Sequence, residues 1–275
     1  MSLKASIIIS FYNKIDWLTL VLAALERQSE KNFEVIIADD GSNDTVVNAI
    51  QDYTKSTPLS IQHVWHPDNG FLKTTILNKS VVASRSEYLI FIDGDCIPHK
   101  NFIEDHLRLS SPNEVIIGRR VNLSDALSKQ ITAEKIKDGF LENSFVARLI
   151  IDSIVNKSKD IEKGIHIQNT KINRLLGTYK KGLLGCNFSI SKSDLLAVNG
   201  FDERYKSPRY GEDTEIAYRF IQFGLKLFMP KFALGQYHLW HKKLGRDSEA
   251  ENAILFEETK TNKYTRTPYG IVKEK

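Results

Sequence analysis

The sharpest chemical feature of the sequence is a pair of aspartates one residue apart. Asp93 and Asp95 flank Gly94 and directly follow the apolar run 88–92. Two carboxylates at this spacing can reach one hard cation, and the glycine lets the backbone approach a phosphate closely. Asp-Gly is also ordinary turn chemistry, so the motif alone fits a turn before a helix over 100–109 equally well.

A second acidic pair favours a binding site over a turn. Asp39 and Asp40 end the apolar run 33–38, and clustered carboxylates are costly without a cation or a hydrogen-bonding ligand. Asp40 could accept a hydrogen bond from a nucleobase N–H, and Tyr12 offers an aromatic face on which a base could stack. Lys73, just inside a predicted helix, could meet phosphate or base. Taken singly, Tyr12 fits plain packing and Lys73 fits a solvated lysine.

Glu212 and Asp213 form a third acidic feature, introduced by Gly211 at the start of a predicted helix. Acidic residues in a first turn are expected from capping and the helix dipole alone. The functional alternative is a general base, a carboxylate held near an acceptor hydroxyl group.

Two histidines follow the last predicted strand, which spans 228–237. His238 and His241 could each supply a neutral nitrogen ligand to a metal ion, although lone histidines are more often surface or core residues. Of the two, we favour His238 because it lies nearer the strand.

An alternation of strands and helices positions these residues in the first 118 positions. Apolar, β-branched runs predict strands over 6–10, 33–38, 60–65 and 88–92, with an amphipathic helix pattern after each of the first three. Strands of this kind are covered on both faces, and repeated strand–helix–strand units imply a mainly parallel sheet between helical layers. Ligands of such sheets bind beyond the carboxyl ends of the strands. The residues after these strands should therefore converge on one cleft.

The rest of the chain divides by composition. Residues 119–181 are polar and rich in Lys and Asn, with helical patches, and predict an inserted helical or mobile region. Order returns over 182–245, which holds the Glu212–Asp213 helix and the strand over 228–237. A polar tail with one amphipathic stretch follows over 246–275.

Composition excludes several classes of protein. The chain has 275 residues, 41% of them hydrophobic, and a formal net charge of +4. A disordered chain or a disulfide-dense miniprotein is excluded, and a dedicated nucleic-acid binder is disfavoured. Two cysteines without a C-x-x-C pair indicate a reducing compartment. Without a signal-peptide pattern or an 18-residue apolar run, we expect a cytoplasmic protein, or one peripheral to the inner membrane.

The order of the motifs resembles the family 2 glycosyltransferases of the GT-A fold, and most of all the N-terminal catalytic domain of bacterial chondroitin-polymerase-type members. The matching segments are IIISFYN (7–13), VIIADDGS (35–42), DNGFLKTTILN (68–78), YLIFIDGDCIPH (88–99), GCNFSISKSDLLAVNGFDE (185–203), GEDTEIAYRF (211–220) and YHLWH (237–241). Each motif alone is weak, but seven in the family's order are highly specific.

The resemblance implies a Rossmann-like α/β fold that binds a UDP-sugar through 1–118 and an acceptor through 182–245. Ser10, Tyr12 and Asp40 match residues that hold the nucleoside, and Asp93 and Gly94 lie where relatives contact ribose and metal. Asp95 and His238 match ligands of Mn²⁺ or Mg²⁺. Glu212 matches a sugar-binding residue and Asp213 the catalytic base of inverting members. Leu72 stands where this subgroup often has arginine, so the phosphate or base contact is expected at Lys73.

The implied activity is transfer of a sugar, with inversion, from a UDP-sugar to a saccharide or lipid-linked saccharide acceptor in the synthesis of bacterial surface polysaccharide or lipopolysaccharide. Two alternatives remain open at this point. One is a metal-dependent phosphohydrolase, a class that also uses Asp-x-Asp after a strand, although it places the pair after its first strand. The other is a non-catalytic protein that binds sugar nucleotides on the same fold.

Overall fold

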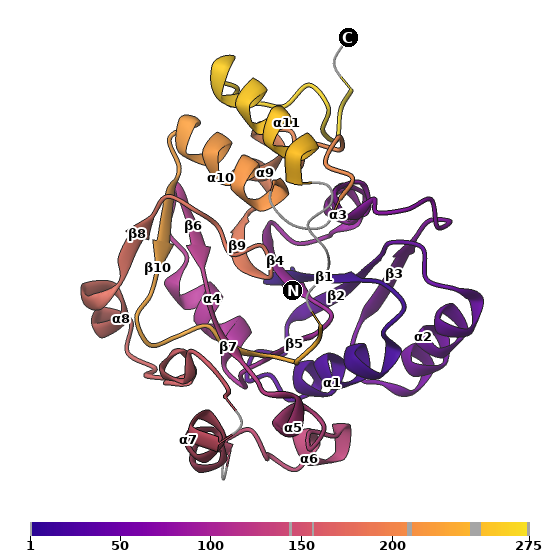
Figure 1. Ribbon diagram of the computed structural model, residues 1–275, viewed down its shortest axis with the longest axis vertical. Coiled ribbons are helices and arrows are strands. Elements are labelled where there is room, and N and C mark those ends of the chain that lie inside the picture. Colours follow the sequence, from indigo (N-terminus) through magenta and orange to yellow (C-terminus); the bar gives the residue numbers. More distant parts are fainter. Residues whose placement is uncertain (1, 143–144, 156, 208–210, 243–248, 274–275) are drawn as a thin grey trace.

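An eight-stranded sheet, ordered β3-β2-β1-β4-β9-β6-β10-β8, forms the centre of the computed structural model (Figure 1). The structure describes residues 2–142, 145–155, 157–207, 211–242 and 249–273. The four neighbouring strands β3, β2, β1 and β4 are mutually parallel. Strand β9 is antiparallel to both β4 and β6, β10 is parallel to β6, and β8 is antiparallel to β10. The strands are β1 (Ala5–Phe11), β2 (Phe33–Asp39), β3 (Ile61–Trp65), β4 (Tyr88–Asp93), β6 (Glu114–Ile117), β8 (Thr178–Lys180), β9 (Asn187–Ser191) and β10 (Lys226–Met229). This architecture confirms the predicted, mainly parallel α/β sheet.

Two hydrophobic cores cover the two faces of the sheet, as the apolar strands predicted. Along β1, Ile7 and Ile9 face one core and Ile8 the other, because successive strand side chains point to opposite faces. The first core includes α1 (Ile15–Glu26), α2 (Asp44–Ser56) and α4 (Phe102–Leu109). The second includes α3 (Lys73–Ala83), α9 (Lys192–Ala197) and α10 (Glu212–Gln222). In Figure 1, α3, α9 and α10 lie above the sheet with α11 (Glu249–Thr261), and α1 and α2 lie below.

A second sheet of three strands, β5-β11-β7, corrects the predicted strand over 228–237. That segment forms two strands: β10 ends at Met229, and β11 (Gly235–His238) pairs with β5 (Cys96–Pro98) and β7 (Arg119–Asn122). Pro230, which lacks a backbone N–H, ends β10, and Leu234 has a φ of 60°. The chain therefore turns out of the large sheet, and His238 comes to lie opposite Cys96, next to Asp95.

Residues 119–181 contain the predicted helices together with two strands that their polar composition concealed. The helices are α5 (Asp125–Ser128), α6 (Ala133–Lys137), α7 (Phe145–Val155), the 3₁₀ helix η1 (Ile161–Gly164) and α8 (Thr170–Leu176), while β7 and β8 are the strands. Leu127, Ile136, Phe145 and Leu149 are buried in the first core. These helices are thus packed against the main body of the protein. The boundary predicted between the segment 182–245 and the C-terminal tail 246–275 lies outside the described residues.

None of the described helices combines the length and the apolar character that crossing a bilayer requires.

A buried ion pair fixes α10, the helix that begins with Glu212 and Asp213. The Arg219 guanidinium donates to the Glu215 carboxylate at 2.6 Å, to the Val198 carbonyl at 2.7 Å and to the Gly200 carbonyl at 2.9 Å. Arg219 and Glu215 are both inaccessible to solvent. Since Val198 and Gly200 follow α9, the arginine joins α10 to the end of α9.

We predict that Arg219→Met lowers the free energy of unfolding by about 3 kcal/mol, because removal of one partner leaves a buried, uncompensated charge. Urea denaturation measures the change. Lys55→Met is the matched control: it breaks an ion pair whose side chains are both 74% exposed, and it should cost less than about 1 kcal/mol. Equal losses in the two variants would contradict the structural role of Arg219.

Candidate functional site

A cavity of about 950 Å³ opens at the carboxyl ends of β1, β2 and β4, where the sequence predicted a cleft. Every predicted site residue except Asp213 lines it: Ser10, Tyr12, Asp40, Lys73, Asp93, Gly94, Asp95, Glu212 and His238. The Gly94 N–H donates to the Ser10 carbonyl at 2.8 Å, which ties the turn after β4 to the end of β1. Residues more than two hundred positions apart in the chain therefore share one cavity.

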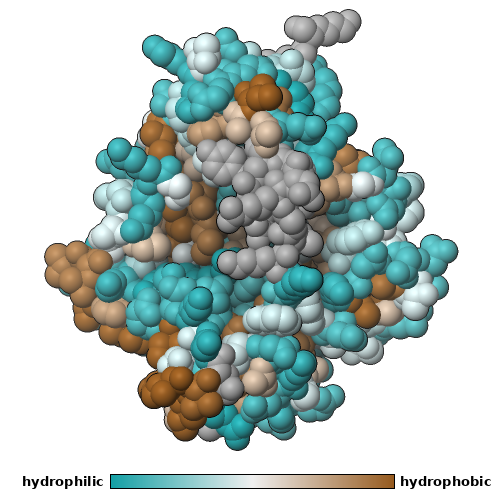
Figure 2. Space-filling model, viewed as in Figure 1, coloured by the Kyte–Doolittle hydropathy of each residue, from teal (hydrophilic) through white to brown (hydrophobic). Residues whose placement is uncertain are grey.

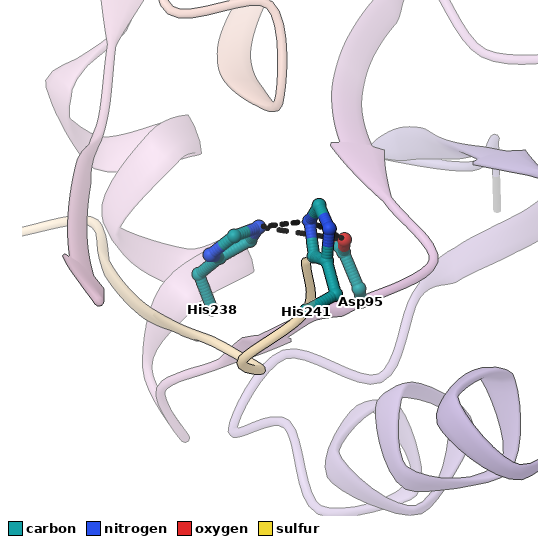
Figure 3. A group of neighbouring side chains, drawn as sticks. All are labelled: Asp95, His238 and His241. Carbon is teal, nitrogen blue, oxygen red and sulfur yellow. Dashed lines mark hydrogen bonds and ion pairs between the residues drawn. The ribbon is translucent and has the colours of Figure 1, made fainter. Parts of the chain in front are cut away.

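Asp95, His238 and His241 converge on one side of this cavity (Figure 3). Nε2 of each histidine lies 3.4 Å from Oδ2 of Asp95, and the two Nε2 atoms lie 3.3 Å apart. Burial opposes ionisation of Asp95, but the hydrogen bond and charge of His238, aided by Cys96 and His241, hold the pKa of this carboxyl below its ordinary value. One carboxylate and two imidazoles form a donor set that fits a divalent cation with coordination positions left open for a ligand.

Lys73 lies among three carboxylates deeper in the cavity. Its Nζ is 3.4 Å from Oδ1 of Asp93 and 3.4 Å from Oε1 of Glu212. Burial alone would lower the pKa of Lys73, but the charges of Asp93, Glu212 and Asp213 outweigh it and raise that pKa. Burial raises the pKa of Glu212. The charge of Lys73 opposes this rise, and the charge of Asp213 adds to it. Lys73 is therefore the positive charge that lets these carboxylates lie close together.

Asp213 lies behind Glu212, against the loop that enters β9. A Cβ atom built on Gly185 would lie 3.2 Å from Cβ of Asp213, so a side chain at this position would be tightly packed against Asp213. Among the described residues, the one hydrogen bond to the Asp213 carboxylate comes from the neighbouring Thr214 hydroxyl at 3.4 Å. The carboxylate consequently keeps most of its capacity to accept a proton or a hydrogen bond.

Asp40, which also lines the cavity, is held by two contacts. Its Oδ1 is 2.8 Å from the His66 ring nitrogen Nε2, and its Oδ2 accepts from the Leu72 N–H at 3.0 Å. Burial raises the pKa of Asp40, against the lowering effect of these two contacts. A carboxylate oxygen can accept two hydrogen bonds, so a ligand N–H can still bind there.

Tyr12 stands at the rim near Asp40, with 48% of its surface exposed. Its hydroxyl donates to the Asp68 carboxylate at 2.9 Å. The Asp68 backbone in turn packs against Gly41, where a Cβ atom would lie 2.5 Å from Cα of Asp68 and where φ is +95°. Gly41 thus allows the loop after β3 to pack closely against the loop after β2. Asp68 in that loop then holds the hydroxyl of Tyr12, whose ring is otherwise open to solvent.

Asp39 differs from the expectation for an acidic pair in the cleft. Its Oδ1 accepts from the Ser42 N–H at 2.8 Å, and its Oδ2 lies 2.8 Å from Nε2 of His63. Because it is the last residue of β2, its side chain points to the opposite face from that of Asp40. Asp39 shapes the turn that carries Asp40 and does not face the cavity.

Sequence reasoning missed several residues that line the cavity or support it. Of the two histidines that the sequence offers as alternatives, His238 and His241, both lie beside Asp95. The residues His66 and Asp68, which the sequence analysis does not single out, follow β3 at the same sheet edge as the predicted clusters. The position of His66 and Asp68 after a predicted strand was a usable signal. Arg120 lines the cavity from β7, a strand that the sequence did not reveal.

Two family models and several known proteins match the sequence of this chain. The model of the family described as "Glycosyl transferase family 2" matches residues 6–192, and one described as "N-terminal domain of galactosyltransferase" matches residues 171–243. A chondroitin synthase of Pasteurella multocida is 28% identical over 231 residues, which are 80% of this chain and 23% of that protein. A hyaluronan synthase of the same species is 25% identical over 256 residues, covering 90% of this chain and 25% of that protein. The chain thus spans about a quarter of the length of these two relatives.

Solved structures share the fold. The structure of GalNAc-T7 with UDP, GalNAc and Mn²⁺ has a TM-score of 0.66 at 14% identity and covers 94% of this chain and 48% of that one. The mannosyltransferase PcManGT of Pyrobaculum calidifontis, in complex with GDP-Man and Mn²⁺, has a TM-score of 0.61 at 13% identity, covering 98% of this chain and 67% of that one. Both agree with the predicted GT-A architecture.

The histidine pair leads to a prediction about metal binding. We expect His238→Ala and His241→Ala each to weaken Mn²⁺ binding more than about tenfold, since even second-shell partners of metal ligands change affinity by about 10–100-fold. Electron paramagnetic resonance of free Mn²⁺ measures the affinity. His166→Gln, a change outside the cavity at a histidine that contacts Asp105, should leave it unchanged. Wild-type affinity in His241→Ala would show that His241 is not a ligand.

Proposed function

Because the chain belongs to glycosyl transferase family 2, we propose that it transfers a sugar from a UDP-sugar to a hydroxyl group of a saccharide acceptor, with inversion at the anomeric carbon. The observation that carries the proposal is the convergence, in one cavity, of the nucleoside-binding candidates Tyr12 and Asp40 with Asp95 and the histidine pair. The fold is shared with proteins solved with UDP or GDP-Man and Mn²⁺. Neither the phosphohydrolase nor the non-catalytic alternative has a comparable observation in its favour.

We place the nucleoside at the rim of the cavity. The exposed Tyr12 ring can stack on the base, and Asp40 can accept from its N–H through the lone pairs that His66 and Leu72 leave free. Ser10 and Gly94, which are joined by a backbone hydrogen bond, line the same cavity. Lys73 is bound to Asp93 and Glu212, so we assign it to the sugar–diphosphate end of the donor.

The metal ion we propose is Mn²⁺ or Mg²⁺, held by Asp95, His238 and His241. Of these two ions, the imidazoles disfavour Mg²⁺, which is bound through oxygen ligands. When bound, the ion neutralises the charge that develops on the leaving diphosphate. The protein's own part is to hold Asp95 ionised beside the two histidines, so that a site for the ion exists before the donor arrives.

Asp213 is the proposed general base. The acceptor oxygen attacks the anomeric carbon, the bond from that carbon to the diphosphate oxygen breaks with its electron pair, and the acceptor proton passes to the Asp213 carboxylate. Among the described residues, few hydrogen bonds occupy this carboxylate, and Lys73 lies close enough to interact with its charge. Glu212 would position a sugar hydroxyl. One base on the acceptor side fits a single displacement with inversion.

The biological role that we propose is assembly of a bacterial surface polysaccharide or lipopolysaccharide. Its support is that the two Pasteurella relatives are named for chondroitin and hyaluronan, both of which are polysaccharides. The acceptor would then be a saccharide or a lipid-linked saccharide.

We predict that Asp213→Asn lowers the turnover of donor by about 10²- to 10⁴-fold, the usual contribution of a general base, while UDP binding changes less than twofold. UDP release from a panel of UDP-sugars with Mn²⁺ measures turnover, and calorimetric titration measures UDP affinity. Asp52→Asn, on the exposed surface of α2, is the control. A wild-type rate in Asp213→Asn would contradict the assignment of Asp213 as the base.

We also expect Asp95→Ala to abolish metal-dependent activity, so metal-dependent activity in this variant would contradict the assignment of Asp95 as a metal ligand.

Helix α7 supports contact with a membrane surface. It is apolar on both sides: Phe145 and Leu149 are buried, while Val146, Ile150, Ile151, Ile154 and Val155 are 49–78% exposed. Figure 2 shows this hydrophobic patch at the lower edge of the molecule, where Figure 1 places α7. Cations flank the patch, because Lys135 and Arg148 both lie over the Phe140 ring and the exposed Lys157 follows the helix. An anionic lipid surface complements both features.

We therefore expect the protein to sediment with vesicles that contain phosphatidylglycerol, and less with vesicles of phosphatidylcholine alone. Ile151→Ser combined with Ile154→Ser should lower partitioning more than tenfold, since burial of one isoleucine contributes about 1.5–3 kcal/mol. Val82→Ser removes a residue of α3 that is 61% exposed and serves as the control. Equal sedimentation of the double variant and the wild type would contradict the assignment.

A further inference from the structure

A second cavity, of about 420 Å³, adjoins the donor cavity, and five of its thirteen lining residues are cations. We propose that it binds an anionic group, a carboxylate or a phosphate, which the acceptor saccharide carries near the hydroxyl that attacks. This inference rests on the proposed function and deepens it by assigning the acceptor its charge class. Its size falls in the range of about 300–1,000 Å³ that is common for ligand sites, and so accommodates a sugar residue together with its charged group.

The charge of the second cavity is strongly positive. Its charged lining residues are Arg119, Arg120, Asp160, Lys163, Lys180 and Lys181. Lys163 and Asn122 satisfy Asp160, at 2.9 and 2.7 Å, and Arg119 is buried and donates to the backbone carbonyls of Glu162 and Lys231. Within the described part of the chain, Arg120, Lys180 and Lys181 form no ion pair. Three cations are therefore available to an anionic ligand.

Arg120 connects the two cavities. It lines both of them and is only partly exposed, and the hydrogen bond that its guanidinium makes in the described structure is with the Cys186 thiol at 3.4 Å. A guanidinium has five N–H donors in a planar fork that matches carboxylate and phosphate. A partly buried arginine with a thiol as its partner retains donors for a bidentate anion.

The second cavity also lies on the side of the proposed base. Its lining includes Leu183 and Leu184, and the next residue, Gly185, lies against Asp213. The loop over 182–186 is thus a thin wall with the anion site on one side and the Asp213 carboxylate beside it. A sugar whose charged group reaches Arg120 and Lys181 would extend past this wall and present a neighbouring hydroxyl group to Asp213.

Lysines on an edge strand have another use, because charge there discourages pairing with other chains. Strand β8 is the last strand of the large sheet, and Lys180 belongs to it. Edge protection would account for Lys180, but it would not account for Arg120, which lies on β7 in the second sheet. The test must separate the two roles.

The experiment compares the binding of three matched saccharides that end in glucose, glucuronic acid or glucose 6-phosphate. Calorimetric titrations are made with UDP and Mn²⁺ present. We expect at least one charged saccharide to bind more than tenfold more tightly than the neutral one, and its identity distinguishes carboxylate from phosphate. In Lys180→Gln combined with Lys181→Gln, this preference should fall at least fivefold. The control replaces Lys171 and Lys226 by glutamine; both are exposed and neither lines the cavity.

Equal affinity of the wild type for charged and neutral saccharides would overturn the anion site. A double variant that keeps the full preference for the charged saccharide would also overturn the anion site. If that variant aggregates but keeps the preference, the two lysines serve to protect the sheet edge. Release of UDP from UDP-sugars by the wild type tests the proposed function separately. Charge-selective binding without UDP release would contradict the proposed function and leave the anion site standing, whereas UDP release without charge selectivity would contradict the anion site alone.

Discussion

Mutual repulsion among carboxylates is the constraint on which the rest of the site depends. Asp93, Glu212 and Asp213 lie close enough to Lys73 that the charge of each raises the pKa of the lysine. Lys73 in turn offsets the repulsion among the three carboxylates. Asp95 lies in the same cavity but beside His238 and His241. Because one carboxylate and two imidazoles converge there, the Asp95 side of the cavity is where a divalent cation would be bound most favourably. The same ion would then attract a diphosphate, and so the charge balance of the protein fits the chemistry of a sugar nucleotide.

The fold meets this constraint through two sheets. The large sheet brings Asp40 and Asp93 to one edge, since parallel strands end on the same side. The small sheet then folds the end of the chain back, pairing β11 with β5 and β7, so that His238 lies next to Asp95. Strand β7 contributes Arg120 as well, and the Arg219–Glu215 pair fixes the helix that begins with Glu212. The residues proposed to bind the donor, the acceptor and the metal ion therefore come from different parts of one chain.

Local pattern predicted the four parallel strands β1 to β4 of the large sheet and failed for the small sheet, for physical reasons. The run Ile7–Ile9 is apolar on every side chain because both faces of β1 are covered, and such a signal is visible in sequence. Strands β5 and β7 have three and four residues, and β7 contains two arginines, so neither shows periodicity. The predicted strand over 228–237 hid a change of sheet at Pro230 and Leu234. The convergence of Asp40, Asp93 and Asp95 followed from strand direction, whereas the pairing of His241 with His238 and the inward position of Arg120 depend on tertiary contacts.

The central claim is that Asp95, His238 and His241 hold a divalent cation against the diphosphate of a nucleotide bound between Tyr12 and Asp40. Anomalous scattering from crystals grown with UDP and Mn²⁺ tests it most directly. The account predicts one manganese peak bonded to the Asp95 carboxylate, to both imidazoles and to the UDP diphosphate, with the uracil ring on Tyr12. A manganese peak that none of these three side chains contacts, or UDP bound outside this cavity, would contradict it.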